Sequence, residues 1–213
     1  MKLFLFGVTG NAGQAILQEA LSRGHVVTAA ARQTGFFHPV GKASVVTADV
    51  LELDTATLKD SIKGHDAVVV AISGRKSGHD TVARAATNLL ATMPEAGVSR
   101  LLWVGGAGSL EVAPGLRLVD TPQFPAIYKE EALGQAAALQ TLRAGKTSVN
   151  WTYVSPPAMI GVGGRTGKYR VGGDQLLVDG NGVSTITWID YAVAVVDELE
   201  KNAHPQARIT VAY

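Results

Sequence analysis

Three glycines spaced three residues apart, Gly7, Gly10 and Gly13, follow a short apolar run near the start of the chain. Glycine in a helix costs roughly 1 kcal/mol relative to alanine, so this cluster requires a compensating interaction. A glycine-rich turn between a buried strand and a helix lets the backbone approach a pyrophosphate, whose charge the helix N-terminus stabilises. Helical periodicity over the next residues supplies the context that this motif requires. The turn therefore predicts a dinucleotide-binding site, formed by Gly7, Thr9, Gly10, Asn11, Ala12 and Gly13.

The end of the second predicted strand bears on the choice of dinucleotide. Enzymes that prefer NAD usually carry an acidic residue about 20 residues past the glycines, where it binds the ribose 2′-hydroxyl. This chain has Ala31-Arg32-Gln33 there instead, and Arg32 suits a 2′-phosphate. The alternative is a solvated arginine at a strand end. The sequence thus favours NADP(H) and leaves NAD(H) open.

Composition limits the classes of partner. Of the 213 residues, 46% are hydrophobic and 17% are charged, which is typical of a compact globule. The net charge is +1 and no block of Lys and Arg stands out, so we expect neither nucleic acid nor a membrane as the main partner. The chain has no cysteine, which excludes disulfides and thiolate chemistry. Because the apolar run at 3–6 is too short for a signal peptide, we expect a cytoplasmic protein.

Short apolar runs alternate with helical patterns along the first half of the chain. The runs lack polar alternation, as strands buried on both faces do. Such strand-helix-strand alternation requires right-handed crossovers and yields a parallel sheet with helices on both faces. We therefore predict an α/β fold with a Rossmann-like, doubly wound parallel sheet. Its strands are expected at 2–8, 25–31, 43–48, 65–72 and 100–105, and its helices at 12–23, 54–63 and 79–96, with Asp54 or Thr55 as the N-cap of the second helix and Gly64 at its end.

The pattern changes after Gly106. A loop over 106–125 precedes a long Ala-rich helix at 126–144 and a strand at 150–155. A Gly-rich stretch, a hairpin, a helix capped by Asp190 and a last strand follow, at 161–173, around 179–182, at about 191–201 and at 209–213. This C-terminal portion is too small to fold alone. We expect one domain over 1–213, with a small substrate-side lobe built mainly from about 156–190.

Segments in both halves of the chain resemble one family. The glycine spacing, Asp49-Val50 after the third strand and "AISG" at 71–74 after the fourth resemble the atypical and extended short-chain dehydrogenase/reductases. Within them, the chain is similar to the NmrA-like NAD(P)H-binding group that includes biliverdin reductase B, and most similar to its bacterial NADH-flavin reductases. The segments that carry this likeness are "GGAGS" (105–109), "WTYVSPP" (151–157), "GGRTGKYRVGGDQLLVD" (163–179), "GVSTITWIDYAVAVVDELE" (182–200) and "ARITVAY" (207–213).

The resemblance implies a Rossmann-like fold, a nicotinamide cofactor and the reduction of a flavin such as FMN or FAD. It also implies roles for residues at strand ends. Asp49 and Val50 would flank the adenine, the segment Ala71, Ile72 and Ser73 would run beside the ribose, and Ser155 and Pro156 would border the nicotinamide. Gly106 and Ala107, after the fifth strand, complete the expected cofactor-binding set.

The catalytic Tyr and Lys at i and i+4 that are usual in short-chain enzymes are absent, because Tyr128 is followed by Ala132. The Lys and Glu of many NmrA-like relatives are Gly134 and Ala138 here. A carbonyl reductase needs a proton donor for the developing alkoxide, and the sequence offers no convincing set. Flavin reduction needs less, since both rings carry their own reactivity and the protein contributes stacking, distance and exclusion of water.

A few further side chains are candidates for contact with substrate. Ser109 follows the fifth strand and could hydrogen-bond the substrate or the nicotinamide amide, or it could cap its loop. Tyr128 could stack on a ring at the pocket mouth, or it could have only a structural role and pack against neighbouring side chains. Arg165, Lys168 and Arg170 could contact a flavin phosphate or an acidic substrate tail, although the sequence favours a solvated loop.

The histidines have neither the spacing nor the carboxylate neighbours of a metal site or a catalytic triad, so we interpret them as structural or solvated and expect no metal. They are His25, His38, His65, His79 and His204.

Together these patterns predict an NAD(P)H-dependent oxidoreductase, monomeric or homodimeric, whose acceptor is a flavin or a quinone-like molecule. The alternative is an NADP(H)-binding, redox-sensing regulator without turnover, because loss of the Tyr-Lys pair fits both. A nucleotide-sugar epimerase would need the missing tyrosine and a larger lobe.

Overall fold

The computed structural model describes residues 1–33, 43–50, 53–75 and 78–213. Its centre is an eight-stranded sheet in the order β10-β12-β8-β5-β4-β1-β2-β3. The described pairings are parallel except that of β10 with β12. The order reverses between β1 and β4, so the predicted doubly wound, Rossmann-like fold is confirmed. The strands are β1 (Lys2–Phe6), β2 (Val26–Ala31), β3 (Ala43–Thr47), β4 (Ala67–Val70), β5 (Arg100–Val104), β8 (Asn150–Ser155), β10 (Arg170–Gly172) and β12 (Ala207–Ala212).

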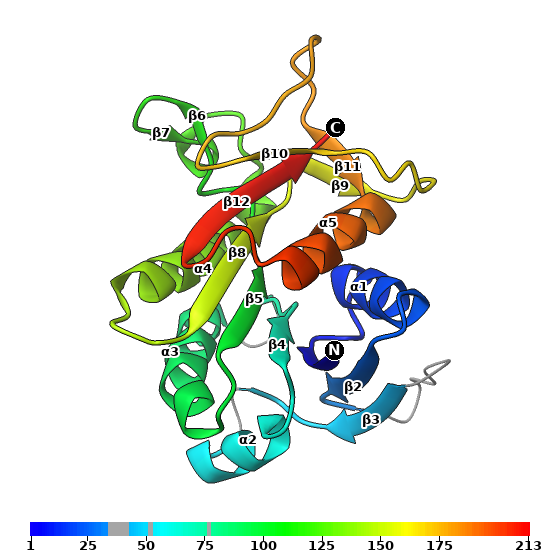
Figure 1. The fold of residues 1–213 in the computed structure, drawn as a ribbon. Coiled ribbons are helices and arrows are strands. Elements are labelled where there is room, and N and C mark those ends of the chain that lie inside the picture. Colours follow the sequence, from blue (N-terminus) through cyan, green and yellow to red (C-terminus); the bar gives the residue numbers. More distant parts are fainter. Residues whose placement is uncertain (34–42, 51–52, 76–77) are drawn as a thin grey trace.

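Helices cover both faces of the sheet (Figure 1). Helices α1 (Asn11–Ser22) and α5 (Trp188–Lys201) pack on one face, and α2 (Thr55–Ile62), α3 (Asp80–Glu95) and α4 (Ala126–Ala144) on the other. Leu3 and Leu5 of β1 belong to the hydrophobic core between the sheet and helices α1 and α5. Phe4 and Phe6 belong to the core on the opposite face, under α2, α3 and α4. Since successive strand residues point to opposite faces, four apolar residues in a row serve both cores.

Helix boundaries follow local capping chemistry. The carboxylate of Asp54 accepts a hydrogen bond from the Thr57 amide at 2.9 Å and so begins α2, as predicted. Gly64, just beyond its end, has φ +78°, a conformation that favours glycine. The limits of α4 and β8 are those predicted from the sequence.

The prediction that Asp190 caps the last helix is wrong. Helix α5 begins at Trp188 because the Thr187 hydroxyl is the N-cap and accepts from the Asp190 amide at 3.2 Å. The Asp190 carboxylate is fully buried and accepts instead from the Thr166 and Gly167 amides. It therefore holds the Gly-rich loop against the helix.

Short strands that the sequence did not predict build the lobe over the ends of β8 and β12 (Figure 1). Strands β9 (Met159–Gly161) and β11 (Thr185–Thr187) pair in parallel, and β6 (Glu111–Ala113) and β7 (Leu116–Arg117) form a hairpin after β5, followed by a 3-10 turn, Leu118–Asp120. The hairpin expected around 179–182 is only a turn, closed by a bond from the Gly182 amide to the Asp179 carbonyl at 3.0 Å.

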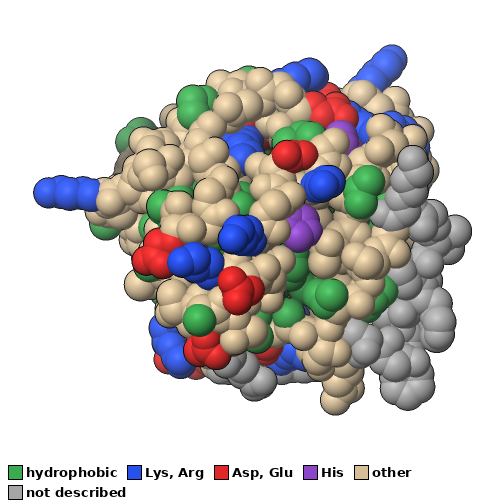
Figure 2. Space-filling view, turned by 60° about the horizontal axis from the view of Figure 1, so that its bottom comes forward, with side chains coloured by type: hydrophobic (Ala, Val, Ile, Leu, Met, Phe, Trp, Pro, Cys, Tyr) green, Lys and Arg blue, Asp and Glu red, His purple; other side chains and the backbone are tan. Residues whose placement is uncertain are grey.

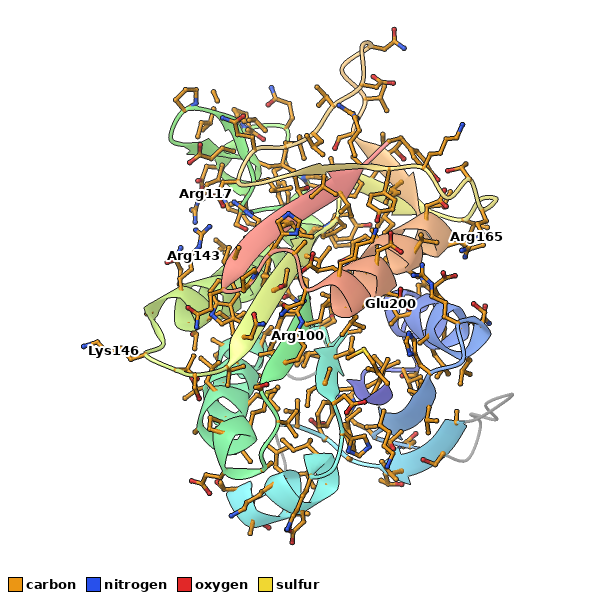
Figure 3. The ribbon with its side chains drawn as sticks, viewed as in Figure 1. Arg100, Arg117, Arg143, Lys146, Arg165 and Glu200 are labelled. Carbon is orange, nitrogen blue, oxygen red and sulfur yellow. The ribbon has the colours of Figure 1, made fainter. Side chains whose placement is uncertain are left out.

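Polar side chains tie this lobe to α1, to α5 and to the residue after β12. Arg165 extends toward α1 (Figure 3), where its guanidinium pairs with Glu19. The Tyr169 hydroxyl donates to Asp197 of α5 at 2.7 Å. Arg170 donates to the Tyr213 carbonyl at 2.9 Å. Two of the three basic side chains that the sequence assigned to a solvated loop therefore make contacts within the protein.

Charged side chains of both signs are intermixed on the face that Figure 2 brings forward. This distribution agrees with the net charge of +1. Within the described ranges, no helix has the length and apolar character needed to span a bilayer.

Candidate functional site

The turn between β1 and α1 uses its three glycines differently. Gly7 has φ +80°, and a Cβ there would lie 2.1 Å from the Ala71 carbonyl oxygen. A Cβ on Gly13 would lie 2.2 Å from the Gly7 carbonyl oxygen. At Gly10, the nearest atom to a Cβ would be 3.6 Å away, an ordinary van der Waals contact. The protein's own packing thus requires Gly7 and Gly13 but not Gly10.

Gly10 lies at the N-terminus of α1. It is the N-cap residue, and no side chain of the described part of the chain caps the helix. A helix N-terminus offers amide donors and the positive end of the helix dipole. The described atoms thus leave room for a side chain at position 10. The chemistry of the turn fits an anion such as a pyrophosphate.

A pocket of about 300 Å³ opens at this turn. It lies at the carboxyl ends of β1 to β4, where the strand order reverses and where doubly wound sheets bind ligands. Nine residues predicted to bind the cofactor line it: Gly7, Thr9, Gly10, Arg32, Asp49, Val50, Ala71, Ile72 and Ser73. Five lining residues were not predicted: Phe6, Ala30, Ala31, Ala48 and Arg75. Each lies within two residues of a predicted one and could have been found from that proximity in the chain.

Three charged side chains line this pocket. Arg32 Nε lies 4.0 Å from Asp49 Oδ2. The Arg75 guanidinium lies over the ring of Tyr128, 5.3 Å from its centroid. Two guanidiniums and one carboxylate leave the lining with a net positive charge, which favours an anionic ligand.

The other residues expected at the cofactor lie beside this pocket and do not line it. Asn11, Ala12 and Gly13 form the first turn of α1. Gly106 and Ala107 follow β5, and Ser155 and Pro156 lie at the end of β8. Since β5 pairs with both β4 and β8, these strand ends continue the pocket's edge of the sheet. Whether they contact a cofactor stays a prediction.

Two buried residues that the sequence did not single out fix the wall of the site. Gln135 of α4 donates to the carbonyl of pocket-lining Ile72 at 3.0 Å. The Tyr153 hydroxyl donates to the Gln135 carbonyl and accepts from the Gly106 amide, both at 3.0 Å. Burial raises the pKa of Tyr153, so the phenol stays neutral and keeps both bonds. A glutamine in an Ala-rich helix gives no sequence signal for this role.

The two substrate-contact candidates lie apart. Ser109 Oγ lies 3.4 Å from Arg208 Nη1, which is also 3.4 Å from Ser155 Oγ. Tyr128 is 47% exposed on the first turn of α4, beside Arg75. The structure therefore groups Ser109 with Ser155 at the β5–β8 edge and Tyr128 with the pocket. Their roles in binding stay predictions.

Three of the histidines lie close to carboxylates in the fold. Their shortest nitrogen–carboxylate distances are 2.9 Å from His25 to Glu200, 2.8 Å from His79 to Glu130, and 2.7 Å from His204 to Glu198. His25 and His79 meet carboxylates far away in the sequence, which spacing alone does not show. In the described ranges, no group of three or more His, Asp or Glu side chains is arranged to hold a metal ion. His38 lies outside those ranges.

A family model described as NAD(P)H-binding matches residues 7–201 of the chain. Among known proteins, the uncharacterized protein YwnB of Bacillus subtilis is 40% identical over 214 residues, which cover 99% of this chain and 98% of YwnB.

Two solved structures share the fold over the full chain. One, from Streptococcus pneumoniae, is described as a "putative NADH-flavin reductase"; it has a TM-score of 0.85 at 36% identity, with 100% of this chain and 99% of that chain covered. The other, from Bacteroides thetaiotaomicron, is described as a "putative epimerase"; it has a TM-score of 0.88 at 37% identity, with 100% and 96% covered.

Proposed function

The chain belongs to the NAD(P)H-binding family, and from that membership we propose that it is an oxidoreductase that passes hydride from a nicotinamide dinucleotide to a flavin or a quinone-like acceptor. Binding of NAD(P)H follows from the family model, which spans 7–201. The acceptor is the finer part of the proposal. It is supported by the name of the Streptococcus pneumoniae relative and by the side chains that this chain lacks.

The observation that carries the proposal is the space left at Gly10. A pyrophosphate against this residue would meet the amides of α1, and the adenosine half would occupy the pocket beside β2 and β3. Arg32 and Arg75 supply the positive charge that a 2′-phosphate requires. We therefore propose NADP(H) as the preferred cofactor.

The bound cofactor would supply the hydride, so the chain's own residues have to hold, orient and shield the two rings. Gly106, Ala107, Ser155 and Pro156 would border the nicotinamide at the ends of β5 and β8. Ser109 would donate a hydrogen bond there. Binding, distance and exclusion of water are sufficient contributions for transfer between two rings that carry their own reactivity.

A carbonyl reductase or an epimerase fits this chain less well. Ala132 stands where the catalytic lysine of short-chain enzymes would be, and it is buried against Gly108, so close that a Cβ on Gly108 would lie 2.5 Å from its own. A lysine at position 132 would have to displace that loop. The chain therefore lacks the Tyr-Lys pair with which short-chain enzymes protonate an alkoxide.

The proposal is tested by consumption of NADPH in the presence of FMN, FAD, riboflavin or a quinone, with an aldehyde as the control acceptor. We expect oxidation with at least one flavin or quinone and none with the aldehyde. Retained NADPH binding without oxidation by any acceptor would overturn the enzymatic proposal and favour the NADP(H)-binding regulator.

A further inference from the structure

Arg208 of β12 carries a guanidinium that is 2% exposed and that reaches three segments of the chain. Its Nε donates to Asp174 Oδ1 at 2.6 Å, and its Nη2 donates to the Asp174 carbonyl at 3.1 Å. Its Nη1 lies 3.4 Å from the hydroxyl oxygens of both Ser109 and Ser155. One buried cation thus connects the lobe, the loop after β5 and the end of β8.

The three nitrogens of this guanidinium are not equally satisfied. A buried charge is stable only where its N–H groups find partners. Burial lowers the pKa of Arg208, and the Asp174 carboxylate opposes that effect. Burial would raise the pKa of Asp174, but hydrogen bonds from Arg143 and Arg208 outweigh it and hold the pKa below its usual value. Nε and Nη2 share this ionised partner, whereas the contacts that Nη1 makes in the described structure are two long ones to serines.

The loop that carries Ser109 is fixed to the lobe by backbone bonds as well. The Glu111 amide donates to the Asp174 carbonyl at 2.9 Å, and the Leu176 amide donates to the Glu111 carbonyl at 2.9 Å. The Asp174 carbonyl therefore accepts from both Arg208 and the residue two places after Ser109. Arg208 holds this loop both through its backbone neighbour and through the Ser109 side chain.

We propose that Arg208 is a positioning residue, which orients the Ser109 hydroxyl as a hydrogen-bond donor at the nicotinamide end of the site. The inference rests on the proposed function. A serine oxygen that accepts from a guanidinium keeps its own O–H free to donate elsewhere. Ser109 is half-buried whereas Ser155 is fully buried, so Ser109 is the serine that can reach a ligand.

A donor at this place orients the nicotinamide and does not change the proton count. The hydride carries its electron pair from the nicotinamide to the acceptor, and a hydrogen bond from Ser109 holds the nicotinamide ring in the orientation for that transfer. Solvent supplies the proton that neutralises the reduced acceptor. Ser109 keeps its proton throughout.

Arg143 of α4 offers a matched control (Figure 3). Its Nη2 donates to the same Asp174 Oδ1 at 2.5 Å, but in the described structure it bonds to neither serine. Arg208→Met and Arg143→Met therefore each leave Asp174 with one guanidinium. Only the first removes the contact to Ser109.

The experiment compares the binding of NADPH with that of 2′,5′-ADP, which carries the adenosine half alone, and measures turnover with the best flavin or quinone. We expect both variants to bind 2′,5′-ADP as the wild type does. In Arg208→Met, the ratio of NADPH affinity to 2′,5′-ADP affinity and kcat should each fall about tenfold, the size expected for losing the hydrogen bond that Ser109 makes to the ligand. In Arg143→Met both should stay at the wild-type value.

A double-mutant cycle links the effect to Ser109. Ser109→Ala should lower the affinity ratio in the wild-type background and have no further effect in Arg208→Met. Additive losses would mean that Arg208 does not act through Ser109. Arg208→Lys keeps a cation for Asp174 and lacks Nη1. It should retain the wild-type Tm but lower the ratio of NADPH affinity to 2′,5′-ADP affinity as much as Arg208→Met does. If Arg208→Met does not fold, Arg208→Lys replaces it as the variant that tests the positioning role.

The outcomes separate the two proposals. Failure of the wild type to bind NADPH, or to oxidise it with any acceptor, would overturn the proposed function. A wild type that binds and turns over, with Arg208→Met or Arg208→Lys indistinguishable from Arg143→Met, would overturn the positioning role alone.

Discussion

At the scale of single residues, the glycines of the turn between β1 and α1 differ in role: two are required for packing, and the third is expected to serve binding. Gly7 and Gly13 allow the turn to pack against β4 and against its own helix, because a Cβ at either position would overlap a carbonyl oxygen. Gly10 meets no such obstacle. Substitutions at Gly10 and Gly13, one helical turn apart, should therefore affect different properties of the protein.

Gly10→Ala is expected to change the free energy of unfolding by about 1 kcal/mol or less, since it weakens the N-cap slightly and restricts the unfolded chain. It should weaken NADPH binding about tenfold or more, because a methyl group would fill the space left for the pyrophosphate. Gly13→Ala should instead cost about 1–3 kcal/mol of stability by overpacking. Denaturant unfolding and calorimetric titration measure the two effects. Wild-type NADPH affinity in Gly10→Ala would contradict the assignment.

Arg32→Ala tests the preference for NADP(H). Hydrogen bonds to charged groups are worth roughly 1.5–3 kcal/mol, so loss of a contact to the 2′-phosphate should weaken NADPH by about tenfold or more and spare NADH. Lys63→Ala removes an exposed cation outside the pocket lining and should affect neither. Equal weakening of NADPH and NADH by Arg32→Ala would show that Arg32 does not bind the 2′-phosphate.

At the scale of elements, helix α5 joins α1 and the lobe through Asp197. Its carboxylate accepts from Arg23, the C-cap residue of α1, at 2.7 Å, from Tyr169 of the lobe at 2.7 Å and from Lys201 of α5 at 2.9 Å. Burial alone would raise the pKa of Asp197, but these three donors outweigh it and lower the pKa from 3.8 to about 2. The three elements therefore share one ionised carboxylate.

The lowered pKa sets the direction of the pH dependence. A carboxyl group whose pKa falls on folding stabilises the protein above its unfolded pKa, and this stability is lost as the pH drops through the folded pKa. Asp197 should thus contribute about 2 kcal/mol above pH ~4 that disappears toward pH ~2. Asp197→Asn should lower stability at neutral pH and flatten the decline in acid, as measured by urea unfolding over a pH series. Parallel profiles for the two proteins would contradict this role.

The sequence predicted the long elements well and the short ones poorly. The limits of α4 and β8 follow from sustained periodicity and from a continuous apolar run. Strands β7 and β10 have two and three residues, and their existence depends on partners elsewhere in the chain. The start of α5 was misjudged because two side chains, Thr187 and Asp190, could each cap a helix, and the tertiary contacts of Asp190 decided between them.

The functional site was likewise predictable from the sequence only in part. Residues at the ends of parallel strands share one edge of the sheet, so the sequence could name most of the pocket lining. Gln135 and Arg208 act through hydrogen bonds to Ile72, Asp174 and Ser109, which lie between 34 and 99 residues away in the chain. No local pattern indicates such contacts, and only the folded chain brings them together.

At the scale of the whole molecule, the lobe is joined to the body of the protein by many separate contacts. Strand β10 adds to the main sheet beside β12, and Asp190 and Glu19 bind the loop between β9 and β10. We propose that residues 1–213 unfold as one cooperative unit, because the lobe is too small to form a core of its own. Calorimetry should give one transition whose calorimetric and van't Hoff enthalpies agree. A separate early transition for the lobe would contradict this expectation.

The proposed chemistry depends on a dinucleotide held at the glycine turn, so the decisive measurement is calorimetric titration of the folded wild-type protein with NADPH and with NADH. We expect saturable binding at one site per chain, with NADPH bound about tenfold or more tightly than NADH. Absence of measurable binding of either dinucleotide by well-folded protein would contradict it.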